Sequence, residues 1–107
     1  MTNIEEILGL DEFKKVIKEN NLLLADFYAS WCAPCKMQTP ILAEFQGEML
    51  GKVKVVKIDV DQNPELASKF SVQSIPSLLL FKNGELKQKT VGLTAKATLS
   101  EMLIKHI

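Results

Sequence analysis

The sequence predicts an α/β fold in which helices cover both faces of a mixed central β-sheet. Two apolar or β-branched runs, 22–29 and 52–60, are each followed by a segment with helical spacing. A later stretch, 77–91, carries Asn83-Gly84 between two β-rich runs, a strong signal for a two-residue hairpin turn. Strands separated by helices pair in parallel and hairpin strands pair antiparallel, so we expect both arrangements in one sheet, flanked by about four helices.

The N-terminal third is expected to contain a helix followed by a strand. Within 11–20 the apolar side chains recur at helical spacing, at Phe13, Val16 and Ile17. Asp11 is the expected N-cap of this helix, which ends by Asn20. The continuous apolar run 22–29 is typical of a strand covered on both faces. The sequence also allows a short strand before residue 10.

A second helix is expected to follow the two cysteines of the chain and to end near Gly51. Apolar residues repeat every four positions along it, at Met37, Ile41, Phe45 and Met49. Pro40 lies inside this segment, where it lacks a backbone donor and is expected to kink the helix. The β-rich run 52–60 then predicts the second strand.

The two remaining helices have recognisable starts. Asn63 is the expected N-cap of a short helix that begins at Pro64, and Leu66 and Phe70 form its apolar face. After the hairpin, Thr94 and Thr98 are alternative caps of the last helix, and Thr98 with Glu101 matches a capping box. The core side of this helix is expected to carry Leu99, Met102 and Leu103.

Length and charge indicate one domain that spans 1–107 and binds neither nucleic acid nor an anionic membrane surface. A chain of 107 residues suits a single core. Thirteen lysines balance thirteen acidic residues and there is no arginine, so the basic excess that phosphate-rich partners require is missing. The acidic N-terminus lacks the features of a secretory signal, which predicts a cytoplasmic protein, although a secreted chain without its signal would look the same.

The chain has two cysteines, Cys32 and Cys35, and their spacing indicates chemistry rather than a structural crosslink. A disulfide across so short a loop adds only about 2 kcal/mol of stability. Cys32 falls where a strand has ended and a helix starts, so the helix dipole is expected to lower the pKa of its thiol. Pro34 suits the first helical turn, and Cys35 lies on the same helix face, from which it can attack a mixed disulfide formed at Cys32.

Five motifs, in order, resemble the thioredoxin family over nearly the whole chain: ADFYAS, WCAPCK, KIDVDQNP, SIPSLLLFKNGE and TVGLT. The resemblance implies a thioredoxin fold and a protein-disulfide reductase that works through a reversible Cys32–Cys35 disulfide without a bound cofactor or metal. It also implies a monomer that is recycled by thioredoxin reductase, an NADPH-dependent flavoprotein. The implied clients include ribonucleotide reductase, peroxiredoxins and methionine sulfoxide reductase.

Asp26 and Lys57 are the candidate proton-transfer residues. Asp26 lies within an apolar strand, where burial would raise the pKa of its carboxyl; the alternatives are an exposed strand end or a carboxylate bonded to backbone. The resemblance implies that Asp26 assists proton transfer at Cys35 and that Lys57 lies near this aspartate. Without the resemblance, Lys57 would be interpreted as a surface lysine.

The resemblance also implies a client-binding surface around the disulfide. Trp31 would supply an apolar contact beside Cys32, although a lone tryptophan is more often part of a core. Pro76 would be cis, although most X–Pro bonds are trans, and Ile75 would offer its backbone to an extended client segment. Gly92, otherwise a strand-ending glycine, would permit close approach of the client. The remaining members of this surface are the residues between the cysteines, Ala33 and Pro34.

Three features depart from the family pattern: Ala33 replaces a common glycine, Tyr28 a common tryptophan and Ser74 a common glycine. Pro34 favours a reductant, because oxidising relatives typically have histidine at that position. Three alternatives stay open. They are an oxidant or isomerase of the same fold, a zinc ion shared between two chains, and a binding module that does not use its thiols.

Overall fold

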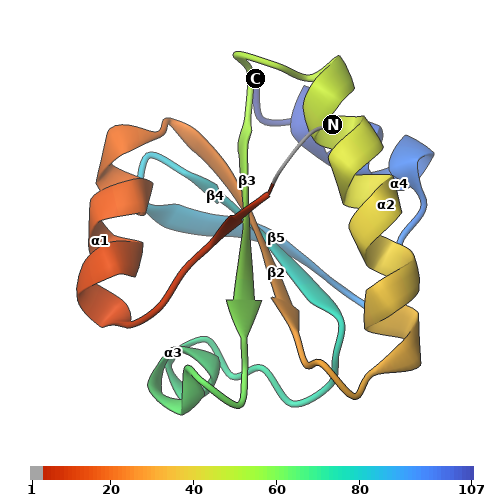
Figure 1. The fold of residues 1–107 in the computed structure, drawn as a ribbon. Helices are drawn as coiled ribbons and strands as arrows, with labels where there is room; N and C mark the ends of the chain where they lie inside the picture. Colours follow the sequence, from red (N-terminus) through yellow and green to blue (C-terminus); the bar gives the residue numbers. More distant parts are fainter. Residues whose placement is uncertain (1–3) are drawn as a thin grey trace.

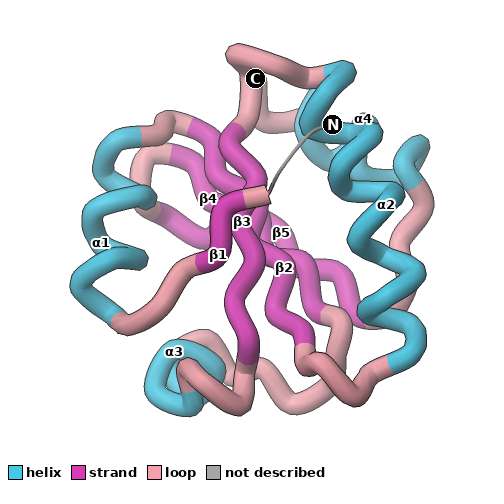
Figure 2. The backbone as a smooth tube through the Cα atoms, viewed as in Figure 1, coloured by secondary structure: helices cyan, strands magenta, loops and turns pink. Residues whose placement is uncertain are grey.

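The structure, a computed structural model that describes residues 4–107, has a five-stranded mixed sheet with helices on both faces (Figures 1 and 2). The strand order is β1-β3-β2-β4-β5. In chain order the elements are β1 (Glu5–Glu6), α1 (Leu10–Glu19), β2 (Leu22–Tyr28), α2 (Ala33–Glu48), β3 (Lys54–Asp59), α3 (Pro64–Lys69), β4 (Ser77–Lys82), β5 (Glu85–Val91) and α4 (Lys96–Ile104).

The pairing of the strands confirms the predicted mixed sheet. Strands β1, β3 and β2 are parallel, whereas β2 pairs antiparallel with β4 and β4 antiparallel with β5. Asn83 and Gly84 both have positive φ angles, 51° and 84°, which is the geometry of the predicted two-residue hairpin turn. The optional strand before residue 10 exists as β1, at one edge of the sheet.

Alternation along β2 divides the interior into two apolar clusters, one on each face of the sheet. Leu23, Ala25 and Phe27 pack with residues of α1 and α3. Leu22 and Leu24 point to the opposite face, where α2 and α4 lie (Figure 1). The second cluster includes the three α4 residues expected in the core, Leu99, Met102 and Leu103.

The buried face of α2 agrees with the predicted one only in part: Phe45 is buried, and Ile41 and Met49 pack against the second cluster. Met37 is 59% exposed, and the residues of α2 that are buried are Cys35, Gln38, Leu42, Phe45 and Gln46. Gln38 and Gln46 occupy interior positions that the apolar repeat does not identify, and backbone groups bond to their side chains. Pro40 lies within α2, which is unbroken from Ala33 to Glu48.

The expected N-cap of α1 is corrected, whereas the expected N-cap of α3 is confirmed in position. The N-cap of α1 is Gly9, and Asp11 lies inside the first turn. Asn63 is the N-cap of α3 and precedes Pro64 as predicted, but its side chain makes no capping hydrogen bond. Instead its amide donates to the carbonyl of Ile7 and accepts from the N–H of Gly9, so it joins the end of β1 to the segment before α3. The side chain is used for a tertiary contact, which overrides its local capping preference.

Neither threonine caps α4, contrary to prediction. The N-cap is Ala95, and Thr98 lies within the helix. The hydroxyl of Thr94 donates to the carbonyl of Gly92 instead, and its backbone bonds to Gln38. None of the helices within residues 4–107 is long and apolar enough to cross a membrane.

Candidate active site

The two cysteines lie where β2 has ended and α2 begins. Cys32 is the N-cap of α2, and the backbone N–H of Cys35 donates to the Sγ atom of Cys32 at 3.3 Å. The two residues form a disulfide, with their Cα atoms 5.2 Å apart. Pro34 occupies the first helical turn, where an N–H group is not needed. The predicted pairing and the predicted position at a helix start are therefore both confirmed.

The disulfide is almost covered by protein. Cys32 is 5% exposed and Cys35 is 2% exposed. Both pack with Ala29 against the half-buried side chains of Tyr28, Val60 and Ile75. The carbonyl oxygen of Ile75 lies 3.9 Å from the Sγ atom of Cys32.

Trp31, Ala33 and Pro34 surround the disulfide on its exposed side. The side chain of Trp31 is 69% exposed, so it does not belong to the core. Its Nε1–H donates to the Oδ2 atom of Asp61 at 2.8 Å, which fixes the direction of the ring. Ala33 and Pro34 are exposed. This arrangement leaves an apolar ring, held in one orientation, next to the sulfur atoms.

A loop from a distant part of the chain contacts the disulfide through Ile75, and a second loop is hydrogen-bonded to the first. The Ile75–Pro76 peptide bond is cis, as the family resemblance implies, and Pro76 is buried. The N–H of Gly92 donates to the carbonyl oxygen of Pro76 at 2.8 Å, which joins the two loops. Gly92 has a φ angle of +91°, and a Cβ there would meet no atom within 4 Å. The left-handed backbone, rather than a lack of space, is what favours glycine here.

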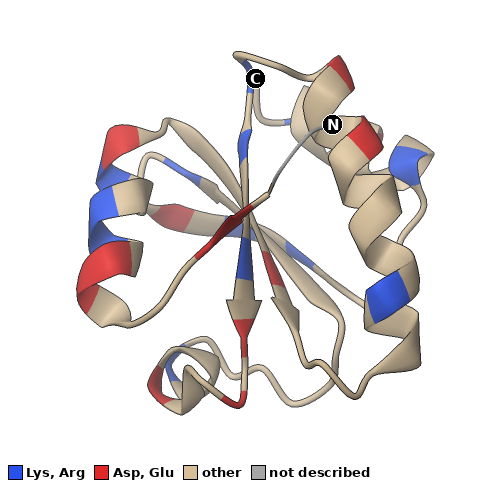
Figure 3. Cartoon of the chain, viewed as in Figure 1, with Lys and Arg blue, Asp and Glu red and all other residues tan. Residues whose placement is uncertain are grey.

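The segments around the disulfide carry no charge. No acidic or basic residue occurs in 29–35, 70–81 or 91–95. Figure 3 shows the loop between β2 and α2 without charged residues, whereas α1 carries both signs along its surface. A partner that docks on these segments would meet apolar and uncharged polar side chains and backbone groups, with the carboxylate of Asp61 beside Trp31.

Asp26 is a buried carboxylate without a hydrogen-bond partner. It follows Leu22 and Leu24 in the alternation of β2, so it points to the face covered by α2 and α4. Its exposed fraction is 0%, and within residues 4–107 neither of its oxygens has a hydrogen-bond partner. Loss of solvation raises the pKa of Asp26 from 3.8 to about 7. The alternatives of an exposed or backbone-bonded aspartate are therefore wrong.

Lys57 faces the same region from the neighbouring strand. It lies directly opposite Asp26 in the register of β2 and β3. Its Nζ atom donates to the Oγ1 atom of Thr39 at 3.0 Å and lies 4.1 Å from the centre of the Tyr28 ring. The cation opposes the rise in the pKa of Asp26, whereas the carboxylate of Glu6 adds to it. Lys57 is thus half-buried and oriented, not a free surface lysine.

Replacing Lys57 with methionine is expected to raise the pKa of Asp26 further, because a cation that favours the ionised carboxylate is removed. The increase should be about one pH unit, the lower end of the effect of one nearby charge. Carbon-13 NMR titration of the Asp26 carboxyl would measure it. Lys54→Met on the same strand is the matched control, since Lys54 pairs with Glu5 at the surface. Equal titration curves in both variants would contradict the influence of Lys57.

Several residues of the site were not identified from the sequence. Thr39 holds Lys57, Asp61 orients Trp31, and Gln38 bonds to Thr94 in the loop that follows Gly92. One available signal was the position of Gln38, three residues after Cys35 and four before the apolar Leu42, which places it on the inward face of the helix. The other contacts join segments that are far apart in the sequence.

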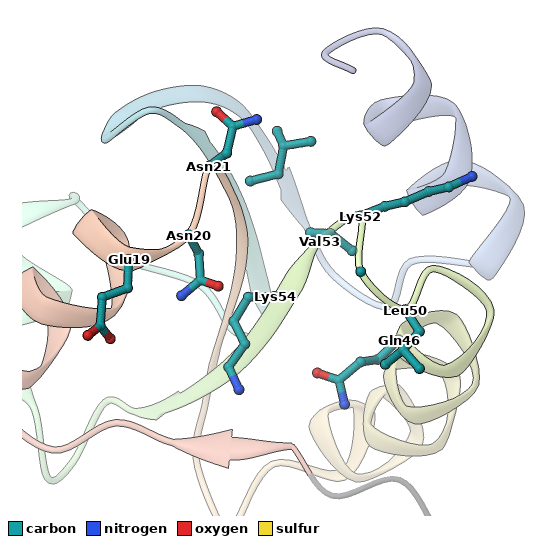
Figure 4. A pocket seen from close by; sticks show the side chains of 10 residues that line it. Glu19, Asn20, Asn21, Gln46, Leu50, Lys52, Val53 and Lys54 are labelled. Atoms are coloured by element: carbon teal, nitrogen blue, oxygen red, sulfur yellow. The ribbon is translucent and has the colours of Figure 1, made fainter.

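The hollow shown in Figure 4 is not part of this site. It has a volume of about 440 Å³ and lies at the starts of β2 and β3, whereas Cys32 follows the end of β2. Its lining includes Asn21, Gln46 and Lys54 but neither cysteine. Across residues 4–107, no three His, Cys, Asp or Glu side chains are grouped so that they could hold a metal ion.

Comparisons with known proteins agree with this geometry. The family profile described as Thioredoxin matches residues 6–105. The chain is similar to a thioredoxin of Rickettsia felis, with 48% identity over 96 residues that cover 89% of this chain and 91% of that one. It also resembles a mutant thioredoxin from Halobacterium salinarum, with a TM-score of 0.90, 36% identity, and coverage of 97% of this chain and 90% of that one.

A third similar structure was determined in work on "the thiol resolving mechanism in yeast mitochondrial 1-Cys peroxiredoxin via glutathione/thioredoxin systems". It matches with a TM-score of 0.88 and 35% identity. The match covers 96% of this chain and 95% of that one.

Proposed function

This chain belongs to the thioredoxin family and is a thiol-disulfide oxidoreductase, and we propose that it works in the reducing direction on disulfides of client proteins. The observation that carries the proposal is the disulfide at the start of α2, with Cys32 at the rim and Cys35 behind it. Pro34 between them is the residue type expected of a reductant. The buried Asp26 adds a proton acceptor whose pKa is about 7.

In the first step, Cys32 is the nucleophile. Its thiolate attacks one sulfur of the client disulfide, so the client S–S bond breaks and a bond between Cys32 and the client forms. The client sulfur that leaves takes up a proton. The N–H of Cys35 already donates to Sγ of Cys32 in the oxidised form, and the same donor would stabilise the thiolate.

In the second step, Cys35 resolves the mixed disulfide. Its thiol transfers a proton to Asp26, which can accept it because a carboxyl with a pKa of about 7 is partly ionised at neutral pH. The Cys35 thiolate attacks Cys32, the bond to the client breaks, and the second client sulfur leaves and is protonated. Two electrons have then passed to the client, and the Cys32–Cys35 disulfide is restored. Lys57 keeps part of the Asp26 population ionised.

The client segment is proposed to lie across the uncharged surface around the disulfide. Trp31, Ala33 and Pro34 supply one side, and Ile75 offers backbone groups on the other. Pro76 contributes no backbone donor beside the sulfur atoms, which leaves the backbone of Ile75 as the pairing partner. Gly92 leaves space at the end of this surface. Backbone and apolar contacts do not require one particular client sequence. Clients of different sequence could therefore bind, as a general reductant requires.

We also propose the partners and setting that follow from this activity. A separate NADPH-dependent flavoprotein, thioredoxin reductase, would reduce the Cys32–Cys35 disulfide again, and residues 1–107 would act as one monomeric domain without a bound cofactor. Clients would include peroxiredoxins, ribonucleotide reductase and methionine sulfoxide reductase. The similar structure from the work on a yeast mitochondrial peroxiredoxin connects a thioredoxin system with such a protein, which supports the first of these clients. The proposed location is the cytoplasm, where such a reductant has oxidised clients to serve.

The reduction potential of the Cys32–Cys35 pair tests the direction of electron flow. Purified protein would be equilibrated in dithiol–disulfide buffers, and the oxidised fraction would be counted by alkylation and mass spectrometry. We expect about −270 mV, the value typical of thioredoxin. A value of about −120 mV, as in strong oxidants, would contradict both the proposed reducing direction and the proposed reducing compartment.

A further inference from the structure

Gln38 forms a paired contact between the redox helix and the loop before α4. It lies one turn after Cys35 on the inward face of α2, and its exposed fraction is 0%. Its Nε2–H donates to the carbonyl oxygen of Thr94 at 3.0 Å, and the N–H of Thr94 donates back to its Oε1 atom at 2.7 Å. One side-chain amide thus satisfies both backbone groups of a residue 56 positions away.

Thr94 is also hydrogen-bonded to the loop that carries Gly92, on the proposed client surface. Its hydroxyl donates to the carbonyl oxygen of Gly92 at 3.0 Å, and the hydroxyl of Thr90 lies 3.0 Å from it. The N–H of Gly92 in turn donates to the carbonyl oxygen of Pro76 at 2.8 Å. The loop that carries Gly92 is therefore tied to α2 on one side and to the loop of Pro76 on the other.

These bonds, together with one contact at Ile75, form a closed series of contacts that passes through Cys32. The carbonyl of Ile75 lies 3.9 Å from Sγ of Cys32, and Cys32 is joined through the first turn of α2 to Gln38. The proposed client surface is built from the three uncharged segments 29–35, 70–81 and 91–95. The ladder between β4 and β5 ends at Ser77 and Val91, and beyond it the bond from Gly92 to Pro76 and the paired bonds of Gln38 with Thr94 join these segments.

An apolar side chain would be the simpler choice at position 38 if packing alone mattered. Leu42, one turn further along the same face, is equally buried. A buried amide costs free energy unless all its groups are bonded, and even then its net contribution is only modest. An amide at this position forms directional hydrogen bonds, and these bonds hold the helix and the loop at one separation.

We propose that Gln38 is a positioning residue that sets the distance between the redox helix and the Gly92 loop, and so determines affinity for an extended client segment. The inference rests on the proposed function, because it concerns binding of the client. Gln38 touches neither the sulfur atoms nor the client. It acts through Thr94, which holds the Gly92 loop at the distance that lets a client backbone pair beside Ile75.

Gln38→Met tests the proposal, since methionine has a similar length and cannot form the paired bonds. Pre-reduced protein would be mixed with excess insulin as a disulfide-bonded client, and oxidation would be followed by the fluorescence of Trp31, the single tryptophan. The half-saturating client concentration should rise about fivefold to tenfold, as expected for one or two lost net hydrogen bonds, while the limiting rate stays the same. The rate with bis(2-hydroxyethyl) disulfide, which is too small to span the loops, should not change.

Gln46→Met is the matched control. Gln46 is on the same helix and is also buried, and its Oε1 atom accepts from the N–H of Val55 near the start of β3, far from the disulfide. This variant should lose stability without any change in the half-saturating concentration. Hydrogen exchange at the amide of Thr94 should become faster in Gln38→Met by at least about tenfold and stay unchanged in Gln46→Met.

Thr94→Val supplies a second test if Gln38→Met does not fold. Valine keeps the backbone pair with Gln38 but removes the hydroxyl bonds to Gly92 and Thr90, so the half-saturating concentration should again rise. An unchanged value in the folded Gln38→Met variant, or in Thr94→Val when the first is unfolded, overturns the proposal. An equal rise in Gln46→Met also overturns it, because the effect would then be general destabilisation. Failure of the wild-type protein to reduce insulin would instead contradict the proposed function.

Discussion

The Cys35→Ser variant is expected to accumulate a covalent complex in which Cys32 is joined to the client by a disulfide. Serine cannot attack the mixed disulfide, so the reaction stops after its first step. The turnover rate with client should fall at least about a thousandfold, because the sulfur atom that resolves the mixed disulfide is removed. Non-reducing electrophoresis and intact mass spectrometry would detect the complex, which a strong thiol reductant should release.

The order of the two cysteines is tested by the opposite substitution. Cys32→Ser should form no complex and reduce no client, since Cys35 is the more buried of the two at 2% exposure and lies behind the rim. A stable complex formed through Cys35 in this variant would mean that the assigned roles are reversed. Retention of the protein's biological activity in a Cys32→Ser, Cys35→Ser double variant, which has no thiol left to reduce a disulfide, would instead favour a binding module that does not use its thiols.

Asp26→Asn should stabilise the oxidised protein, and the gain should grow as pH rises from about 4 to about 7. Below the ordinary pKa of 3.8, the folded and unfolded states both keep the proton, so ionisation carries no penalty. Above it the unfolded chain ionises while the folded chain does not, and wild-type stability falls until pH passes the folded-state pKa of about 7. A rise from 3.8 to about 7 corresponds to a loss of about 4 kcal/mol at high pH.

Urea unfolding at pH 4, 5.5, 7 and 8 would measure this difference between variant and wild type. Asn is chosen because it has the shape of Asp and cannot ionise. Asp11→Asn makes the same chemical change on the exposed side of α1, where it should alter the pH profile of stability only slightly. A difference between Asp26→Asn and wild type that does not vary with pH would show that the buried carboxyl titrates normally.

The order of the elements could be predicted from the sequence because the signals for it are local. The hairpin turn depends on Asn83 and Gly84, whose φ angles are both positive. The start of α2 depends on Pro34 and on the end of the preceding apolar run. Strand and helix patterns involve neighbours within a few residues, so they can be recognised in the sequence without knowledge of the fold. The position of Cys32 at a helix start followed from the same local signals.

Predictions about faces and caps were less secure because they depend on what the side chain meets. The inward face of α2 differs in part from the apolar pattern, since it includes Gln38 and Gln46, which find backbone partners in other elements. Asn63 is the N-cap of α3, but its side chain bonds to Gly9 far along the chain, and the hydroxyl of Thr94 bonds to the nearby carbonyl of Gly92 rather than to the start of α4. Capping contributes about 1 kcal/mol, so a distant partner of similar strength is enough to redirect such a side chain.

The sequence by itself determined the mixed α/β architecture, the paired thiols and the likeness to one family. Only the tertiary structure decided that Asp26 is enclosed without a hydrogen-bond partner within residues 4–107, that Thr39 and Tyr28 hold Lys57, and that Gln38 reaches Thr94. The reason is physical. Local structure follows from steric preferences along a few bonds, whereas burial, pKa and the spacing of loops depend on which distant segments pack together.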